Sequence, residues 1–98
     1  MIMFSYRIFE SGSDKMLAVC DKELLGKTFV EGDVEIVVSR EFYGDKEAGT
    51  DILKIARKST IINAIGRNIV SLLIEEEIVD ESSVISLGSV PHAQVVSV

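Results

Sequence analysis

Three side chains in the sequence could support covalent catalysis, namely Cys20, His92 and Asn63. Cys20 stands just before Asp21, at the expected start of a short helix, where backbone N–H groups and the helix dipole stabilise a thiolate. A cysteine nucleophile also needs a base and an orienting amide, which His92 and Asn63 would supply. The criterion is loose, because the chain has one cysteine and one histidine, and a cysteine that ends an apolar strand is usually a small buried hydrophobe. We therefore treat these residues as catalytic candidates and assign no catalytic residue.

A metal or cofactor site is not expected. A zinc site needs three or four ligands, and a single cysteine with a single histidine offers too few soft donors. Lys27 follows Gly26, but the glycine pattern of a phosphate-binding loop and the long helix after it are both missing. The sequence therefore predicts no cofactor and no metal ligand.

The positive charge in the second half of the chain is concentrated in one segment. The formal net charge is −6, which argues against indiscriminate binding to nucleic acid. Between Ile52 and Ile74 the only charged residues are basic: Lys54, Arg57, Lys58 and Arg67. The first three fall on one side of a predicted helix and form a candidate phosphate-binding surface. The plainer alternative is a solvated helix face.

The segment after Pro91 is a second binding candidate. Proline fixes φ and removes a hydrogen-bond donor directly before a predicted strand. His92 and Gln94 share one face of that strand, where they either hold loop backbone or line a recognition cleft. The candidate binding residues are thus Lys54, Arg57, Lys58, Arg67, His92 and Gln94.

Hydrophobic runs bounded by turn residues predict the strands that carry these side chains. The first three form an antiparallel meander over residues 2–9, 16–20 and 34–38. A brief helix over 22–25, capped by Asp21 and ended by Gly26, interrupts this meander. Two more strands, 84–87 and 93–98, complete the sheet.

Two longer helices are predicted in the middle of the chain. The first spans residues 52–58, and either Thr50 or Asp51 can cap it. The second starts at Ser59 and carries the main apolar stripe at helical spacing. That stripe consists of Ile61, Ile65, Ile69, Leu72 and Leu73. Residues 40–49 before these helices are predicted to be a loop, whose Phe42-Tyr43-Gly44 string either anchors it to the core or faces a partner.

These elements define the predicted fold class. It is an α+β fold, in which a small, mostly antiparallel sheet packs against two or three helices as a single layer pair. The length of 98 residues supports one core, so residues 1–98 are predicted to form a single domain.

The sequence predicts a cytoplasmic protein with no membrane partner. No segment approaches the roughly 20 consecutive apolar residues of a membrane span. The apolar start is interrupted by Arg7 and no small-residue cleavage site follows, so we interpret it as a strand and not as a signal peptide. The lone cysteine cannot form an internal disulfide, which is normal in a reducing compartment.

Several short strings recur in a recognisable order along nearly the whole chain. They are Cys20-Asp21, Leu24-Leu25-Gly26-Lys27, Phe42-Tyr43-Gly44, Asn63 with Gly66, and Val90-Pro91-His92-Ala93-Gln94. Together they resemble an archaeal family catalogued as domain of unknown function 424. The Val90-Pro91-His92-Ala93-Gln94 string is the most specific part of this resemblance. The loop at residues 45–49 departs from the pattern of the family. The resemblance implies a small archaeal cytoplasmic protein of α+β fold with an association with RNA or translation. It supplies no catalytic residues.

The function predicted from the sequence is a non-catalytic binding module attached to RNA or to a ribonucleoprotein assembly such as the translation machinery. One alternative is a small enzyme that uses Cys20 as the nucleophile with His92. The other is a protein-only assembly subunit, for which the partner is another protein.

Overall fold

The computed structural model describes residues 2–96 of the chain. Its strands are β1 (Phe4–Ser11), β2 (Asp14–Asp21), β3 (Thr28–Glu31), β4 (Val34–Val37), β5 (Lys46–Ala48), β6 (Ile61–Ile65), β7 (Val84–Leu87) and β8 (Val90–Val96). Its α-helices are α1 (Arg40–Tyr43), α2 (Ile52–Arg57) and α3 (Arg67–Glu75), and its 3-10 turns are η1 (Lys22–Leu24) and η2 (Glu81–Ser83).

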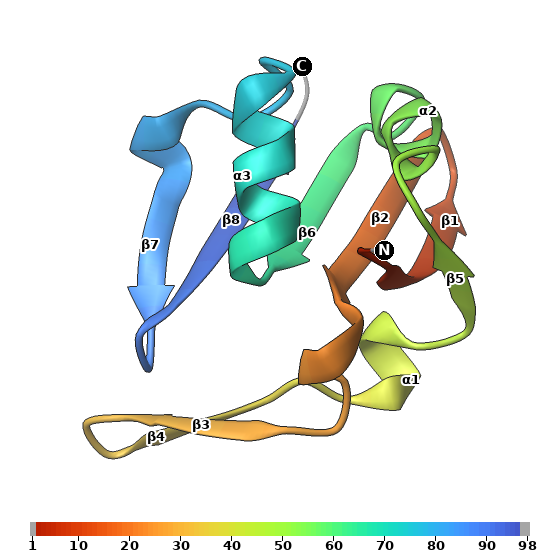
Figure 1. Ribbon diagram of the computed structural model, residues 1–98. Helices are drawn as coiled ribbons and strands as arrows, with labels where there is room; N and C mark the ends of the chain where they lie inside the picture. Colours follow the sequence, from red (N-terminus) through yellow and green to blue (C-terminus); the bar gives the residue numbers. More distant parts are fainter. Residues whose placement is uncertain (1, 97–98) are drawn as a thin grey trace.

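Six strands form one sheet in the order β5-β1-β2-β6-β8-β7, and β3 and β4 form a separate hairpin. Every neighbouring pair is antiparallel except β2 and β6, which run parallel. In Figure 1, α3 crosses in front of β6 and β8, and the β3–β4 hairpin extends below the sheet. The predicted fold class, a mostly antiparallel sheet packed against helices, is confirmed.

The sheet separates two apolar cores, because successive strand residues point to opposite faces. On the first face, Leu17 and Ile62 pack with Ile52 of α2 and with Ile69 and Leu73 of α3. On the second face, the small core contains Ala18, Cys20 and Ile65 beneath Val38 and Tyr43. The first face is therefore covered by the longer helices, and the second by α1, by η1 with Leu25 and by the hairpin.

The predicted meander of the first three strands is wrong. Residues 34–37 form β4, which pairs with β3 and not with the main sheet. The neighbour of β2 is instead β6, with Cys20 in register with Ile65. The reason is the turn after β2. There η1 and Gly26, which has φ +88°, direct the following residues away from the main sheet, so that β3 and β4 pair with each other.

The predicted helix from Ser59 is also wrong, because Ile61–Ile65 form the central strand β6 and the helix starts only at Arg67. A separation of four residues fits a helix face, but it equally places two residues on one side of a strand. Ile61 and Ile65 illustrate this ambiguity. Ile65 lies in the second core and Ile69 in the first, so the apparent stripe is divided between two faces.

The break between β6 and α3 occurs at Gly66. This residue has φ +130°, and a Cβ atom there would lie 2.4 Å from the Asp21 carboxyl carbon. The Asp21 carboxylate accepts hydrogen bonds from the backbone N–H groups of Asn68 (2.9 Å) and Ile69 (2.8 Å). Asp21 thus caps α3, and its side chain makes no capping bond to η1, the helix that the sequence had assigned to it.

Among the described residues, no helix has the length and apolar character needed to cross a membrane.

Candidate functional site

The short helix α1 is fixed on the second face of the sheet by hydrogen bonds from β1. The Ser5 hydroxyl donates to the Tyr43 carbonyl (2.9 Å), and Arg7 Nε donates to the Gly44 carbonyl (3.0 Å). The helix itself is capped by Ser39, whose hydroxyl oxygen accepts from the Phe42 N–H. Tyr43 is buried, so the aromatic string of the predicted loop does anchor that segment to the core.

The hydroxyl of Tyr43 reaches a polar pair on the central strands. It donates to Oδ1 of Asn63 on β6 at 2.6 Å, and the same oxygen lies 3.0 Å from Nε2 of His92 on β8. Because the carbonyl oxygen can only accept, Nε2 carries the proton and Nδ1 is the free acceptor of a neutral imidazole. Burial lowers the pKa of His92 below its usual range, which keeps the ring neutral at pH 7.

The remaining polar atoms of this pair face solvent. Within residues 2–96, neither the Asn63 amide nitrogen nor His92 Nδ1 has a hydrogen-bond partner. Across the same residues, no buried side-chain nitrogen or oxygen atom lacks a partner. Both atoms therefore keep at least some exposure to solvent, so the pair offers one free donor and one free acceptor while its shared oxygen is held by hydrogen bonds. Exposed Gln94 lies directly opposite Asn63 in the strand register.

Aromatic rings continue this arrangement towards β1. The Phe42 ring contacts Tyr43 edge-on, with centroids 4.8 Å apart, and stacks on Phe9 at 5.5 Å. Phe9 and Phe42 are both half-buried, so each keeps part of its ring surface accessible. We refer to the continuous set Phe9, Phe42, Tyr43, Asn63 and His92 as the sheet-face row.

Cys20 does not take part in a catalytic arrangement with His92 and Asn63. Its side chain is fully buried, and burial, together with the nearby Asp21 charge, raises the pKa of the thiol to about 12. No hydrogen bond joins it to His92 or Asn63 in the described part of the chain. The structure therefore brings Asn63 and His92 together and leaves Cys20 as a buried, protonated thiol.

The basic residues of α2 lie on the other side of the sheet. Lys54, Arg57 and Lys58 are exposed, but α2 packs against the first face, opposite the sheet-face row. Arg57 Nη2 forms an ion pair of 2.9 Å with Glu76 at the end of α3. This pair offsets one of the glutamates that would otherwise be unfavourable at a helix C-terminus, and it reduces the positive charge available on α2.

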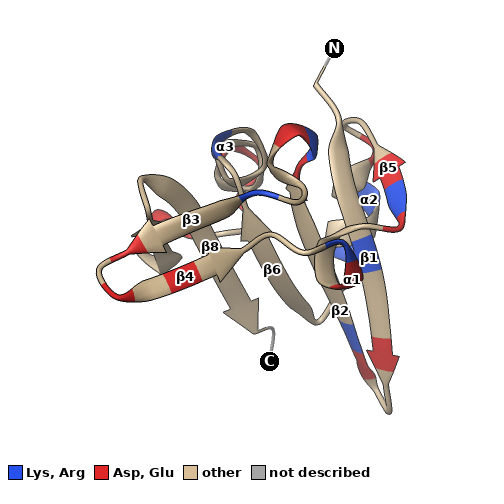
Figure 2. Ribbon diagram, turned by 90° about the horizontal axis from the view of Figure 1, so that it is seen from below, with Lys and Arg blue, Asp and Glu red and all other residues tan. Residues whose placement is uncertain are grey.

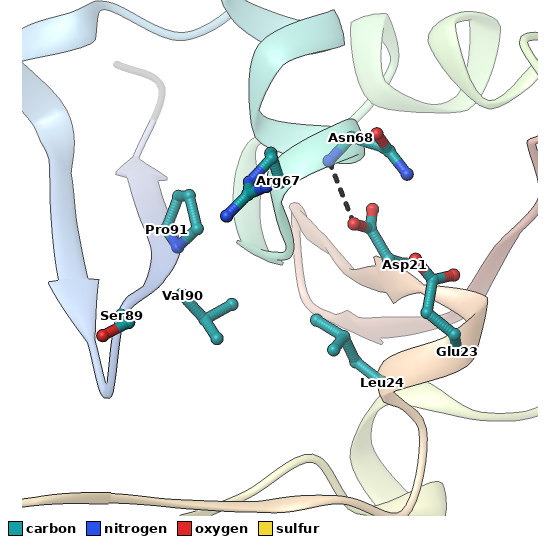
Figure 3. A pocket seen from close by; sticks show the side chains of 8 residues that line it. All are labelled: Asp21, Glu23, Leu24, Arg67, Asn68, Ser89, Val90 and Pro91. Carbon is teal, nitrogen blue, oxygen red and sulfur yellow. Dashed lines mark hydrogen bonds between the residues drawn. The ribbon is translucent and has the colours of Figure 1, made fainter.

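Arg67 is separated from the other basic residues. It starts α3, whereas the Arg57–Glu76 pair lies past the end of that helix, about 13 Å away along the axis. Arg67 instead borders an open cleft between η1, α3 and the β7–β8 turn, which Figure 3 shows in close-up. Asp21 at this cleft already occupies the N–H groups of α3, so the positive end of the helix is neutralised from within the protein.

The sequence did not indicate Phe9 as a site residue, and it singled out Tyr43 only within a string that either anchors its loop or faces a partner. Their contacts depend on α1 and β1 meeting on one face of the sheet, and these segments are more than 30 residues apart in the chain. The available signal was the alternation of Ser5, Arg7 and Phe9, which predicts a shared strand face but not what covers it.

No metal centre was found among the described residues, since no group of three or more His, Cys, Asp or Glu side chains could hold an ion.

The fold and the row define a small α+β protein with one helix-covered and one partly open sheet face. The chain belongs to the family described as protein of unknown function DUF424, whose model matches residues 9–98. It is also similar to the crystal structure of an uncharacterized conserved protein from the archaeon Methanopyrus kandleri, with a TM-score of 0.81 and 25% sequence identity. That match covers 98% of this chain and 94% of the other. None of the curated proteins compared matches the chain.

Proposed function

We propose that the protein is a non-catalytic module that binds single-stranded RNA through the sheet-face row, either as free RNA or within a ribonucleoprotein assembly such as the translation machinery. The observation that carries the proposal is the fixed pair of Asn63 and His92, whose free amide N–H and imidazole nitrogen face solvent. An unpaired base offers adjacent acceptors and donors on its edge, and this is the pattern such a pair can hydrogen-bond.

The aromatic end of the row supports the same ligand. Proteins that bind single-stranded RNA stack bases on aromatic side chains presented by a sheet face or loop. Phe9 and Phe42 are half-buried and stacked on each other, so they are held rigidly with part of their surface accessible. Stacking and base-edge hydrogen bonds do not require a strongly basic protein, which is consistent with the net charge of −6.

The test measures fluorescence anisotropy of a labelled, mixed-sequence single-stranded oligoribonucleotide with the wild-type protein and three variants. His92→Ala and Gln94→Ala should each weaken binding by about fivefold or more, the effect of losing roughly one hydrogen bond to the base. Lys58→Gln, an exposed change on the opposite face, is the matched control and should bind like wild type. Duplex RNA should bind more weakly than the single strand.

The proposal fails if the folded wild-type protein shows no saturable binding, or if Lys58→Gln weakens binding while His92→Ala and Gln94→Ala do not. The second outcome would assign the RNA contact to α2. Circular dichroism of each variant confirms that a loss of binding is not a loss of folding.

A protein-only assembly role is the second candidate, and the β3–β4 hairpin favours it. Val30 and Val37, which share one face of the hairpin, have exposed fractions of 63% and 54%, so this face presents apolar surface to solvent. Affinity purification from native extract with and without nuclease separates the two functions. Partners that persist after nuclease treatment support the protein-only role, and partners lost with the RNA support the first.

A further inference from the structure

The two parallel strands β2 and β6 end beside each other, with Cys20 in register with Ile65. After β2 the chain turns towards the second face, where Leu24 of η1 packs on the small core. After β6 it turns towards the first face, where Ile69 of α3 packs on the larger core. Neighbouring parallel strands whose connections leave to opposite faces open a crevice at their carboxyl ends, and open sheets with parallel strands bind ligands at this position.

A cleft with a volume of about 280 Å³ occupies this crevice, a size at the small end of the range for ligand pockets. One wall is η1, another is the first turn of α3, and the third is the start of β8. The hydrogen bond from the Gly66 N–H to the Pro91 carbonyl (2.9 Å) holds the start of β8 against the end of β6. The cleft is therefore built from segments that the sheet itself fixes in place.

The apolar part of the cleft consists of Leu24, Val90 and Pro91. Figure 3 shows Leu24 and Val90 facing each other from opposite walls. All three residues are half-buried, so they keep apolar surface exposed in the cleft. A ligand at this position can bury a small aliphatic group between the two walls.

Two opposite charges border the cleft without pairing with each other. In Figure 3, Arg67 reaches towards Pro91 on one side and Glu23 lies on the other. Within residues 2–96, neither side chain takes part in an ion pair. The third charged group, Asp21, is buried and accepts two N–H bonds from α3, which compensate its charge. The cleft thus offers one cation and one anion to a ligand.

We propose that this cleft binds a small zwitterion, a molecule with one carboxylate and one ammonium group on an aliphatic body, as in free amino acids with apolar side chains. The carboxylate accepts from the Arg67 guanidinium, whose N–H donors match its two oxygens. The ammonium group donates to the Glu23 carboxylate. The aliphatic side chain packs between Leu24 and Val90.

The balance of charge favours this class over a phosphate ligand. A phosphate group with nearly two negative charges would be held by Arg67 alone, beside the carboxylates of Asp21 and Glu23. The backbone N–H groups that bind phosphate at helix N-termini are here bonded to Asp21. A ligand without net charge meets neither difficulty.

This inference is independent of the proposed RNA binding, because no residue of the sheet-face row lines the cleft.

The test is an NMR titration of the isotopically labelled protein with L-leucine, because backbone amide shifts detect weak binding and also locate it. Leucine should produce saturable shifts at Leu24, Asn68 and Ser89, and none at Gly32 in the hairpin turn. Two analogues separate the contacts. Leucinamide lacks the carboxylate and isocaproate lacks the ammonium group, so each should bind at least about fivefold more weakly than leucine, the effect of losing one hydrogen bond.

Two variants assign the contacts to residues. Arg67→Gln should weaken leucine binding by at least about fivefold and leave leucinamide binding unchanged. Glu23→Gln should weaken leucine binding similarly and leave isocaproate binding unchanged. Lys54→Gln and Glu35→Gln are the matched controls, because they remove exposed charges of the same signs outside the cleft, and they should bind leucine like wild type.

The same spectra show whether each variant is folded. The proposal is overturned if leucine shifts no amide of the cleft, or if either analogue binds as tightly as leucine. It is also overturned if folded Arg67→Gln or folded Glu23→Gln binds leucine as wild type does.

Discussion

One oxygen atom organises the candidate site. Asn63 Oδ1 accepts from the Tyr43 hydroxyl and lies within hydrogen-bond distance of His92 Nε2, and this arrangement favours the ring tautomer that carries its proton on Nε2. A side chain that is held in this way loses little conformational entropy when a ligand binds. Cys20 lies on the same face but offers no group to a ligand, because its side chain is buried and its thiol stays protonated at neutral pH.

The lowered pKa of His92 predicts an acid-sensitive stability. As the pH falls below about 6.5, the unfolded chain takes up the imidazole proton before the folded protein does. The unfolded state then binds more protons, so the free energy of unfolding should decrease on acidification and should not depend on this group above that pH. Urea unfolding at several pH values between about 5 and 7.5 measures the slope.

His92→Gln provides the comparison, since glutamine does not titrate and the acidic residues are unchanged. The variant should lose part of the stability decrease between about pH 6.5 and 5. A slope identical to that of wild type would mean that His92 has the same pKa in both states.

At the scale of elements, the most constrained junction links the ends of the two parallel strands. Asp21 at the end of β2 caps α3, which follows β6, and the cap requires a residue without a Cβ atom at position 66. The sheet pairing, the helix start and the glycine thus depend on one another, although Asp21 and Gly66 are far apart in sequence.

This dependence predicts non-additive mutations. Gly66→Ala should lower the free energy of unfolding by more than about 2 kcal/mol, because alanine is strained at φ +130° and its Cβ overlaps the Asp21 carboxylate. Asp21→Ala should cost about 1–2 kcal/mol through loss of the cap. The double variant removes the overlap, so its loss should be smaller than the sum by about 1 kcal/mol. Chemical denaturation of the four proteins measures the cycle, and strict additivity would contradict it.

The same junction shows how much of the fold the sequence could predict. The local signals were sufficient for the β1–β2 hairpin, for α2 and for the described part of the C-terminal strands, because alternation and turn residues act over a few positions. Residues 97 and 98 of the predicted last strand lie outside the described residues. The local signals were not sufficient for β6. The spacing of Ile61 and Ile65 fits both a helix and a strand. The choice between them depends on two long-range contacts, which are the parallel pairing with β2 and the Asp21–Gly66 contact. The contact of Tyr43 with the Asn63–His92 pair was missed for the same reason.

At the scale of the whole molecule, charge is distributed unevenly around the sheet. Figure 2 shows β6 and β8 without charged residues, and acidic residues on the β3–β4 hairpin. The exposed lysines of α2 lie on the opposite face from the sheet-face row. An RNA strand on the sheet-face row therefore meets few basic side chains. One of them is Arg7 on β1, which already donates a hydrogen bond to the Gly44 carbonyl.

This distribution predicts a shallow salt dependence of RNA binding. Each neutralised phosphate of a single strand contributes roughly −0.7 to the slope of log K against log salt concentration, so one or two contacts at the row should give about −0.7 to −1.4. Contacts through Lys54, Arg57, Lys58 and Arg67 would instead give roughly −2 to −3. The measurement is a salt titration of oligoribonucleotide binding by wild type and by a variant with Lys54, Arg57 and Lys58 all changed to Gln. We expect equal, shallow slopes, because α2 faces away from the bound strand; a steep wild-type slope that flattens in the variant would place the RNA on α2.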